Sequence, residues 1–483
     1  MKRILSITLV IFISILSVYG QEHVSVHEMH KKQFGNLSLQ KSMFAEDGHD
    51  IIPLQFDKAV SSVSVFGYLP YWEYQTERSL LQYELLTHIA LFDFQADEYG
   101  NLKMPTYWPW TDVINGAHSK GVKAIMCVTN FTAAQITNII SNDANKQNLF
   151  KNIKNIIQQY SLDGVNIDFE GLTKADRGAL INGFMADLTN VIHSAFPGKE
   201  VSFAGPVINW GGWDLPGLAK ACDYIFIMGY DFYGSWSTTT GPNSPLTGGT
   251  YNLTSALTST SFGYGGVIPA NSNKLILGVP YFGHRWHTSS NTAYAKVTKY
   301  IASTFFRSEM DNAQTYGLKW DASSQSPWYG YQQDTVWVQD WFDNDVSTEL
   351  KYNLAASKNL KGIGMWALGQ DGSRPEMWNL LRKRLIAGVD ENKGTLPSGF
   401  SLSQNYPNPF NPSTVINYEI PKASGVSLCI YDLLGREAAV LVDEEKSAGK
   451  YSVTFNGLLP SGVYYYTLRA GEYTASRKMT ILK

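Results

Sequence analysis

Eight short apolar runs, rich in β-branched and aromatic residues, alternate with amphipathic segments along most of the chain. The runs lie at 63–69, 87–94, 122–130, 164–170, 201–207, 224–232, 274–282 and 362–368, with helical patterns such as 151–162 and 177–196 between them. Alternation of strand and helix predicts parallel βαβ units. Eight units over about 330 residues fit an α/β fold of the (β/α)8 TIM-barrel type. A doubly wound open sheet is the alternative, but the Gly-rich phosphate turn that it needs after an early strand is absent.

Two stretches depart from this alternation. The segment 284–360 is longer than one helical connection between parallel strands requires. We therefore expect an insertion between the seventh and eighth barrel strands, with strands of its own such as 335–342. Residues 374–385 are expected to close the barrel domain, which we place at 61–388.

A polar linker with Gly and Pro follows at 389–400. Beyond it, alternating strands separated by turn residues predict a small all-β sandwich domain over 401–483.

The N-terminus has the pattern of a secretory signal peptide. Lys2 and Arg3 precede an apolar run at 4–16, and small residues follow up to Gly20, after which cleavage is expected. The run is shorter than a membrane span requires. No second candidate follows, so the sequence predicts an exported protein, secreted or at the cell surface, without a stable membrane span.

Residues 21–60 are weakly patterned and are expected to form a leader that packs against or trails from the barrel. Within it, His27 and His30 stand in HEMH, at helical spacing. This motif lacks the HExxH spacing of a zinc helix and has no third ligand nearby, so a solvated helix face is the favoured interpretation.

Charge and cysteine content exclude several classes of protein. The chain has 39 Lys and Arg against 42 Asp and Glu, for a net charge of −3, so no basic field indicates a nucleic-acid partner. Cys127, Cys222 and Cys429 are isolated, which predicts neither a disulfide framework nor a metal site. Each is expected to be a small buried apolar residue. No cofactor motif is present, and we expect a monomer.

The run LDGVNIDFEG, 162–171, carries polar side chains at every second position. Asn166, Asp168 and Glu170 therefore share one face of a strand, and in a barrel that face is the interior. Glu170 is last and nearest the mouth, where barrel active sites lie. A lone Glu could simply cap a helix or pair with a cation. Burying three polar side chains in a row costs free energy, which favours a functional role over a purely structural one.

Crowding two acids in this run is expected to raise a carboxyl pKa, as a general acid requires near neutral pH. Asp163 has the opposite parity, which favours hydrogen bonding at the start of the strand over catalysis.

DGVNIDFE resembles the DGxDxDxE signature of glycoside hydrolase family 18, the chitinases and related N-acetylglucosaminidases. MGYD (228–231) is similar to the family's strand-six element, GVPYFGHRW (278–286) to its strand-seven segment, and GMWALG (364–369) to its strand-eight segment. The resemblance covers about residues 63–386.

The resemblance implies a retaining, substrate-assisted glycosidase that cleaves β-1,4 bonds in glycans containing N-acetylglucosamine. Glu170 would protonate the glycosidic oxygen, and the substrate's own 2-acetamido oxygen would attack, so the two-carboxylate distance rule does not apply. Asp168 would bind the acetamide N–H, and Tyr230 would donate its hydroxyl to the acetamide oxygen. This chemistry needs no metal and no cofactor.

The resemblance also implies sugar-binding side chains. Trp366 would form an apolar floor beneath the reacting sugar, and Asp231 would bind a sugar hydroxyl or the Glu170 region. Further contacts are expected from Asn166, Tyr68, Tyr281, Trp286, Trp210 and Trp213. For His284 and Arg285, contact with a sugar substituent and a local salt bridge are both open.

Asn166 departs from the family pattern, because chitinases usually have Asp there. The GVNIDFE form and VTNF (128–131) resemble the branch that includes spore-cortex and peptidoglycan N-acetylglucosaminidases. Chitin, peptidoglycan and the N-glycan core, cut by an endo-β-N-acetylglucosaminidase, stay open as substrates, with peptidoglycan favoured. The alternative from another class is a non-catalytic, chitinase-like glycan-binding barrel. Such relatives usually lose the Glu that this chain keeps.

The C-terminal segment resembles the sorting domain of type IX secretion substrates. The elements that carry the resemblance are LSQNYPNPFNPST (402–414), the YDLLGRE turn, LPSGVYYYTL and the closing RKMTILK. The resemblance implies recognition by the type IX machinery and passage across the outer membrane. A fibronectin-like or carbohydrate-binding accessory domain is the alternative.

Overall fold

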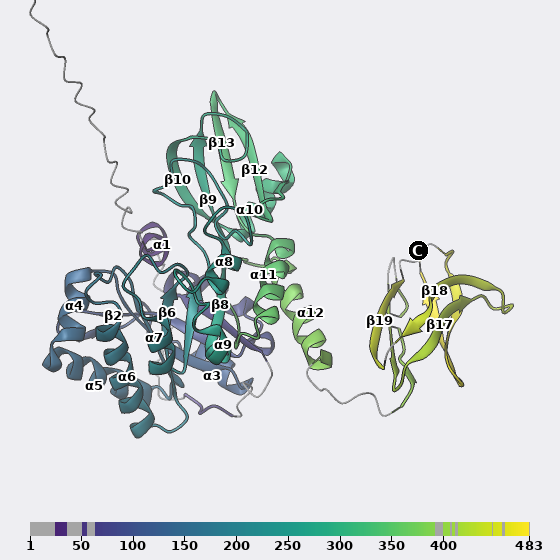
Figure 1. Ribbon diagram of the computed structural model, residues 1–483, viewed down its shortest axis with the longest axis horizontal. Helices are drawn as coiled ribbons and strands as arrows, with labels where there is room; N and C mark the ends of the chain where they lie inside the picture. The colour runs from purple at the N-terminus through teal and green to yellow at the C-terminus, as the bar shows by residue number, and fades with distance from the viewer. Residues whose placement is uncertain are drawn as a thin grey trace, which may run out of the picture. The chain divides into compact units, whose positions relative to one another are not determined.

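The computed structural model describes residues 25–35, 51–55, 63–391, 399–405, 408–410, 414–446, 448–455 and 459–482. The chain divides into two compact units, Met1–Leu385 and Ile386–Lys483 (Figure 1). The expected signal peptide and most of the expected linker lie outside the described residues.

The first unit is built on a closed parallel barrel, so the predicted fold is confirmed. Its strands are β1 (Ser64–Pro70), β2 (His88–Ala96), β4 (Lys123–Asn130), β5 (Gly164–Phe169), β6 (Glu200–Pro206), β7 (Tyr224–Met228), β8 (Leu275–Pro280) and β14 (Gly362–Trp366). They pair in the order β1-β14-β8-β7-β6-β5-β4-β2, and β1 also pairs with β2 to close the ring. The short β3 (Leu102–Lys103) adds an antiparallel edge to β2.

Helices cover the outside of the barrel. They are α2 (Tyr71–Glu77), α3 (Thr111–Ser119), α4 (Ala133–Ser141), α5 (Asp143–Gln159), α6 (Ala179–Ala195), α7 (Leu215–Ala221), α8 (Leu253–Thr258), α9 (Ile268–Asn271) and α11 (Asp345–Ser357). Helix α5 begins earlier than the expected 151 because the Asn142 side chain caps it, accepting from the backbone N–H groups of Ala144 and Asn145. The last helix of the unit, α12 (Glu376–Glu391), runs into the range expected to be linker.

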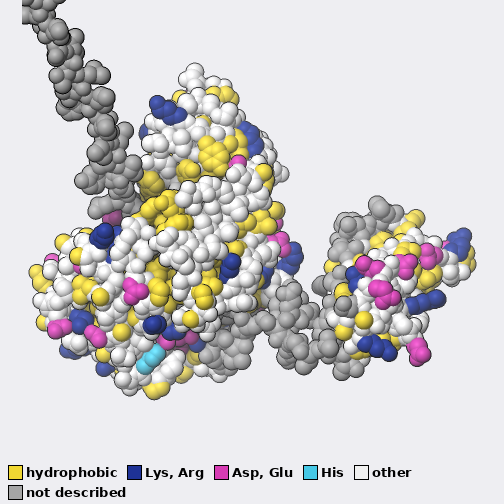
Figure 2. All heavy atoms as spheres, viewed as in Figure 1, with side chains coloured by type: hydrophobic (Ala, Val, Ile, Leu, Met, Phe, Trp, Pro, Cys, Tyr) yellow, Lys and Arg dark blue, Asp and Glu magenta, His cyan; other side chains and the backbone are white. Residues whose placement is uncertain are grey.

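The predicted insertion is a separate small layer between β8 and β14. It contains β9 (Phe282–Thr288), β10 (Val297–Phe305), α10 (Phe306–Tyr316), β11 (Lys319–Asp321), β12 (Ser326–Gln333) and β13 (Val336–Trp341). The strands form one antiparallel sheet in the order β10-β9-β13-β12-β11. Trp286, Trp328 and Trp341 make its own small core. Hydrophobic side chains gather on the surface where the insertion meets the barrel (Figure 2).

The second unit is the predicted β-sandwich. One sheet contains β15 (Ser401–Leu402), β16 (Thr414–Ile420) and β19 (Gly449–Phe455), and the other contains β18 (Glu437–Lys446), β17 (Ser424–Tyr431), β20 (Gly462–Ala470) and β21 (Tyr473–Ile481). Ile416 and Tyr418 from the first sheet share a buried cluster with Leu428 and Leu468 from the second. Alternating inward residues of two sheets are what a sandwich core requires.

All three cysteine thiols are free and buried, as predicted. Among the helices of the described part of the chain, none is long and apolar enough to cross a membrane.

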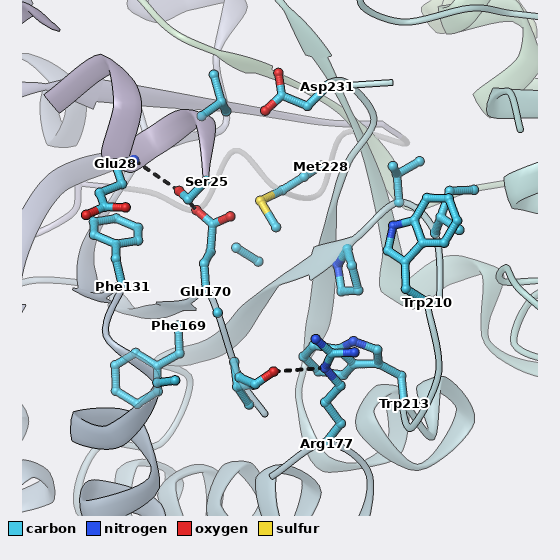
Figure 3. Close-up of a pocket in the computed structure, with 18 of the residues that line it drawn as sticks. Ser25, Glu28, Phe131, Phe169, Glu170, Arg177, Trp210, Trp213, Met228 and Asp231 are labelled. Atoms are coloured by element: carbon cyan, nitrogen blue, oxygen red, sulfur yellow. Dashed lines mark hydrogen bonds between the residues drawn. The ribbon is translucent and has the colours of Figure 1, made fainter. Parts of the chain in front are cut away.

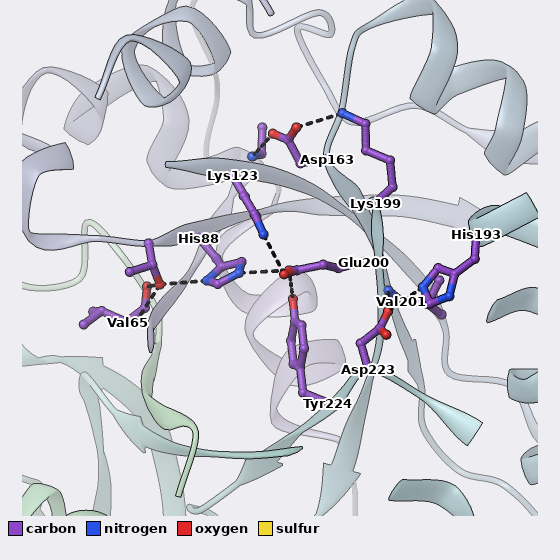
Figure 4. A network of polar contacts seen from close by, with 12 residues as sticks. Val65, His88, Lys123, Asp163, His193, Lys199, Glu200, Val201, Asp223 and Tyr224 are labelled. Carbon is purple, nitrogen blue, oxygen red and sulfur yellow. Dashed lines mark hydrogen bonds and ion pairs between the residues drawn. The ribbon is translucent and has the colours of Figure 1, made fainter. Parts of the chain in front are cut away.

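A polar network joins the first residues of several barrel strands (Figure 4). Glu200, at the start of β6, contacts His88 Nε2 at 2.9 Å, Lys123 Nζ at 2.7 Å and the Tyr224 hydroxyl at 3.2 Å. Asp163 stands at the start of β5 and accepts from the Ala124 N–H at 2.9 Å. The expected strand-start role of Asp163 is therefore confirmed. The network lies at the end of the barrel opposite the mouth, where polar residues serve stability.

Candidate active site

The polar ladder of β5 points into the barrel as its parity predicts. Asn166 and Asp168 are fully buried inside, whereas Phe169 faces outward and packs near Phe184 of α6. Glu170 follows the strand and lines a cavity of about 690 Å³ at the mouth. Figure 3 shows its carboxylate pointing into this cavity, with Trp210 and Trp213 across from it.

Asp168 and Tyr230 face one small volume from two sides. Burial raises the pKa of Asp168 to about 6, against the opposing effect of the nearby His27 imidazole. Burial also raises the pKa of the Tyr230 hydroxyl well above its usual range, so this group is a hydrogen-bond donor at neutral pH. An acid and a phenol in this arrangement can bind the N–H and the oxygen of one amide.

Trp366 ends β14 and is fully buried at the bottom of the same volume. Its ring packs edge-on against Phe92, with ring centroids 4.8 Å apart, and its upper face is covered by the ring of His27. The structure therefore places Trp366 where a floor beneath a ring was expected.

His27 is the residue that sequence reasoning missed. It belongs to α1 (Val26–Phe34), which lies between the barrel mouth and the insertion (Figure 1). The interpretation of HEMH as a solvated helix face is wrong, because both His27 and His30 are fully buried. The spacing HxxH was a signal for one helical face, but nothing local showed that this face covers the barrel.

Asn166 and Tyr68 are hydrogen-bonded to each other inside the barrel, beneath the cavity. The Tyr68 hydroxyl donates to Asn166 Oδ1 at 2.9 Å, and Asn166 Nδ2 donates to Ser202 Oγ at 2.9 Å. Both side chains are fully buried below the cavity. Asn166 therefore holds the Tyr68 hydroxyl from inside the barrel, and the Tyr68 ring faces the ring of His27, with ring centroids 5.8 Å apart.

Asp231 lines the cavity as expected and accepts a contact from His284 Nε2 at 3.2 Å. Arg285 Nε donates to Asp340 Oδ1 at 2.7 Å. Of the two possibilities left open for His284 and Arg285, the structure shows a local contact for each, a hydrogen bond to Asp231 for His284 and an ion pair with Asp340 for Arg285.

Tyr281 and Trp286 do not reach the cleft, so the expectation that they bind sugar is corrected. Tyr281 has the same parity as Leu277 and Val279 of β8, and therefore points away from the barrel interior. Trp286 is buried in the insertion, where its indole N–H donates to the carbonyl of Gly234 at 3.1 Å.

Aromatic residues continue the cleft beyond Asp231. A second cavity of about 600 Å³ shares Trp210 and Asp231 with the first. Its other aromatic lining residues are Phe232, Tyr233, Trp236, Tyr251 and Tyr294. Trp210 is 59% exposed, which makes its ring available for stacking. Sequence reasoning did not select the other five, which the structure places in irregular loops.

The barrel, the acid at its mouth and the aromatic cleft define the class of the protein as a glycosidase. The chain belongs to family 18 of the glycosyl hydrolases, whose profile matches residues 64–371. Residues 404–482 match the secretion system C-terminal sorting domain. Such a domain implies export from the cell or to its surface.

Two curated relatives show similar levels of identity. The chain is 27% identical to the cortical fragment-lytic enzyme of Bacillus subtilis over 316 residues, which cover 61% of this chain and 67% of that protein. It is 28% identical to human di-N-acetylchitobiase over 270 residues, 48% of this chain and 66% of that protein. The chain thus spans about two thirds of the length of these relatives.

Solved structures confirm the fold. The GH18 chitinase from Cycas revoluta in complex with (GlcNAc)3 superposes with a TM-score of 0.57 at 21% identity, covering 68% of this chain and all of that one. The spore cortex-lytic enzyme SleL of Bacillus cereus superposes with a TM-score of 0.51 at 20% identity, covering 66% and 74%.

Proposed function

We propose that the chain is an exported β-N-acetylglucosaminidase that cleaves β-1,4 bonds by a retaining, substrate-assisted mechanism. The observation that carries the proposal is the convergence of Asp168, Tyr230 and Trp366 on one ring-sized volume with Glu170 at its rim. A site built around an acetamide explains why an acid and a phenol share the position.

In this proposal, Glu170 gives its proton to the glycosidic oxygen as the bond to the anomeric carbon breaks. The 2-acetamido oxygen attacks the same carbon and forms an oxazolinium ion, whose N–H is bound by Asp168 and whose oxygen is positioned by Tyr230. Glu170, now a carboxylate, takes a proton from the water that opens the ring. Configuration at the anomeric carbon is retained because two inversions occur.

Peptidoglycan-type glycan is the substrate that we favour over chitin and the N-glycan core. Lys174 and Arg177 line the cavity next to Trp213, and Lys174 is exposed. Chitin is uncharged, whereas peptidoglycan carries free carboxylates on its peptide stems, which a cation would bind. The name of the Bacillus subtilis relative, a cortical fragment-lytic enzyme, supports the same substrate.

For export, we propose a signal peptide at 1–20, a leader at 21–60 and a linker at 389–400. The C-terminal domain would be read by the type IX machinery, which would carry the enzyme across the outer membrane. We expect the exported enzyme to act as a monomer.

The test is hydrolysis of a chromogenic N-acetylglucosamine oligomer by the wild type and by Glu170→Gln. Loss of one general acid is expected to lower the rate by about 10²–10⁴ while binding survives. Glu349→Gln is a matched control, since that carboxylate is 39% exposed and pairs with Lys383 on the surface. Equal turnover by wild type and Glu170→Gln would contradict catalysis. Binding without turnover would favour the non-catalytic lectin-like alternative.

Substrate preference is tested by product analysis on chitin oligomers, purified peptidoglycan and a high-mannose glycoprotein in parallel. Lys174→Ala should weaken action on peptidoglycan and leave the chitin oligomers unaffected. Equal effects on the two substrates would argue against recognition of a peptidoglycan carboxylate.

A further inference from the structure

The chain's own helix α1 occupies the place where the reacting sugar is expected. His27 Nδ1 lies 2.7 Å from Asp168 Oδ2, and His27 Nε2 lies 3.0 Å from the Tyr230 hydroxyl. Ser25, directly before the helix, donates its hydroxyl to Glu170 Oε1 at 2.5 Å. Every residue to which the proposed mechanism gives a proton-transfer or acetamide-binding role is therefore engaged by α1 or by the residue that caps it.

The His27 ring has the shape of the expected intermediate. Imidazole and oxazolinium are both planar five-membered rings with two heteroatoms separated by one carbon. The two nitrogens of His27 stand at Asp168 and Tyr230, in the places of the N–H and the oxygen of an oxazolinium. Only the hydrogen bond to Tyr230 runs the other way, because a protonated imidazole donates from both nitrogens. The imidazole also stacks on Trp366, with ring centroids 3.8 Å apart and planes at 29°. This spacing is van der Waals contact, so no sugar ring fits between them.

The charge of His27 strengthens the likeness. Burial alone would lower the pKa of this imidazole, but the carboxylates of Asp168 and Glu170 outweigh it and raise the pKa to about 10. A cationic ring thus fills the position at which positive charge would develop during hydrolysis.

Several further contacts hold the helix on the cleft. Trp366 donates its indole N–H to His30 Nδ1 at 3.0 Å, and His30 Nε2 lies 2.7 Å from Ser303 Oγ. Lys31 Nζ lies 2.7 Å from Asp93 Oδ2, a carboxylate that is fully buried.

Gln33 anchors the end of the helix to strand β10 of the insertion. Its side-chain amide donates to the Ser303 carbonyl at 2.8 Å and accepts from the Ser303 N–H at 3.2 Å. The Phe34 and Phe305 rings pack with centroids 4.2 Å apart. The helix is therefore fixed at both ends, by the barrel and by the insertion.

We infer that residues 25–35 are an intramolecular inhibitor that competes with the glycan, with His27 in the place of the oxazolinium ring. The inference rests on the proposed function, because it assigns the occupied volume to the reacting sugar. When a segment of the same chain competes with substrate, only the molecules in which that segment is undocked can bind the glycan. The apparent KM is therefore raised by the inverse of the undocked fraction, and kcat is unchanged. The exported enzyme would stay latent until concentrated glycan displaces the helix.

The test compares His27→Ala and Gln33→Ala with the wild type on a short chromogenic N-acetylglucosamine oligomer. Each charge-assisted hydrogen bond lost is expected to shift docking on the order of 10–100-fold. The KM of His27→Ala should therefore fall at least about tenfold, and that of Gln33→Ala by a smaller factor, at unchanged kcat. Lys32→Ala is the matched control on the same helix, because Lys32 is exposed and pairs with Glu28 of that helix. It should keep the wild-type KM.

A synthetic peptide of residues 25–35 should inhibit His27→Ala competitively, and the same peptide with alanine at position 27 should not. If His27→Ala and Gln33→Ala both keep the wild-type kcat and KM, residues 25–35 are not an inhibitor, while the proposed function stands. A fall in kcat of His27→Ala would overturn the inhibitor too, since it would make His27 part of the catalytic machinery.

A metal ion is the rival explanation, since His27, Asp168 and Glu170 offer atoms within 4.8 Å of one another. A chelator that lowers the wild-type KM as His27→Ala does would overturn direct docking of the imidazole. Absence of both turnover and oligomer binding in every variant, His27→Ala included, would instead remove the proposed function itself.

Discussion

Glu200→Gln should destabilise the barrel without touching its chemistry. Gln keeps the volume of Glu but removes the charge that faces Lys123 and His88, whose side chains are 8% and 0% exposed. Removing one partner of a buried ion pair costs about 3–5 kcal/mol, and the 16% exposure of the Glu200 side chain places the effect at the low end, about 3 kcal/mol. At about 2 °C per kcal/mol for a unit of this size, Tm should fall by about 6 °C.

Intrinsic tryptophan fluorescence is the right assay, because all 13 tryptophans lie between Trp72 and Trp378, within the barrel unit. The control is His193→Ala, which removes a contact between a histidine and the carboxylate of Asp223, but at side-chain exposures of 43% and 31%. An exposed pair contributes about 0–1 kcal/mol, so Tm should move by about 2 °C or less.

The pH dependence of the Glu200 effect gives a second check. The contacts with His88 and Lys123 hold the pKa of Glu200 below its ordinary 4.5, despite burial that would raise it. A depressed carboxyl pKa stabilises the fold above pH 4.5, and this stabilisation is lost as pH falls further. The Tm difference between wild type and Glu200→Gln should therefore shrink at acid pH. The reasoning would be refuted if wild type and Glu200→Gln had equal Tm values at pH 7, or if Glu200→Gln had a lower kcat than wild type at 25 °C.

Three further predictions concern the cleft. Tyr230→Phe should lower kcat by about 10²–10³, because one donor to the developing charge is lost, and its Tm should be measured alongside to exclude misfolding. Trp210→Ala should raise the KM for long oligomers more than for a disaccharide substrate, in steady-state kinetics at 25 °C. The His27 imidazole has an ordinary pKa of 6.5 when α1 is undocked and a pKa of about 10 when it is docked. Between these two pH values docking requires uptake of a proton, so docking should weaken as pH rises from 6.5 to 10. The wild-type KM should then approach that of His27→Ala, and a constant ratio would contradict this. The titratable groups that face His27 are Asp168, Glu170, Tyr230, Tyr68 and His30.

The barrel and the acid ladder could be predicted because both depend on local periodicity. The side-chain period of two placed Asp168 inside and Phe169 outside before any tertiary contact was known. The same parity would have excluded Tyr281, which shares its face with Leu277 and Val279. Its selection came from the resemblance of the segment rather than from its period.

The docked helix could not be predicted, since it depends on contacts between distant parts of the chain. His27 and Asp168 are 141 positions apart, and the residues around His27 give no hydrophobic period that demands burial. The cleft aromatics Tyr251 and Tyr294 are a similar case. They stand in loops whose course is set by the barrel and the insertion together.

Substrate-assisted hydrolysis is tested most directly by the configuration of the first product. Proton NMR of the anomeric region, recorded at once after adding an N-acetylglucosamine oligomer, distinguishes the two anomers before mutarotation mixes them. An oxazolinium intermediate held by Asp168 and Tyr230 and opened by water at Glu170 predicts the β-anomer. An initial α-anomer would mean direct attack by water and would contradict the mechanism.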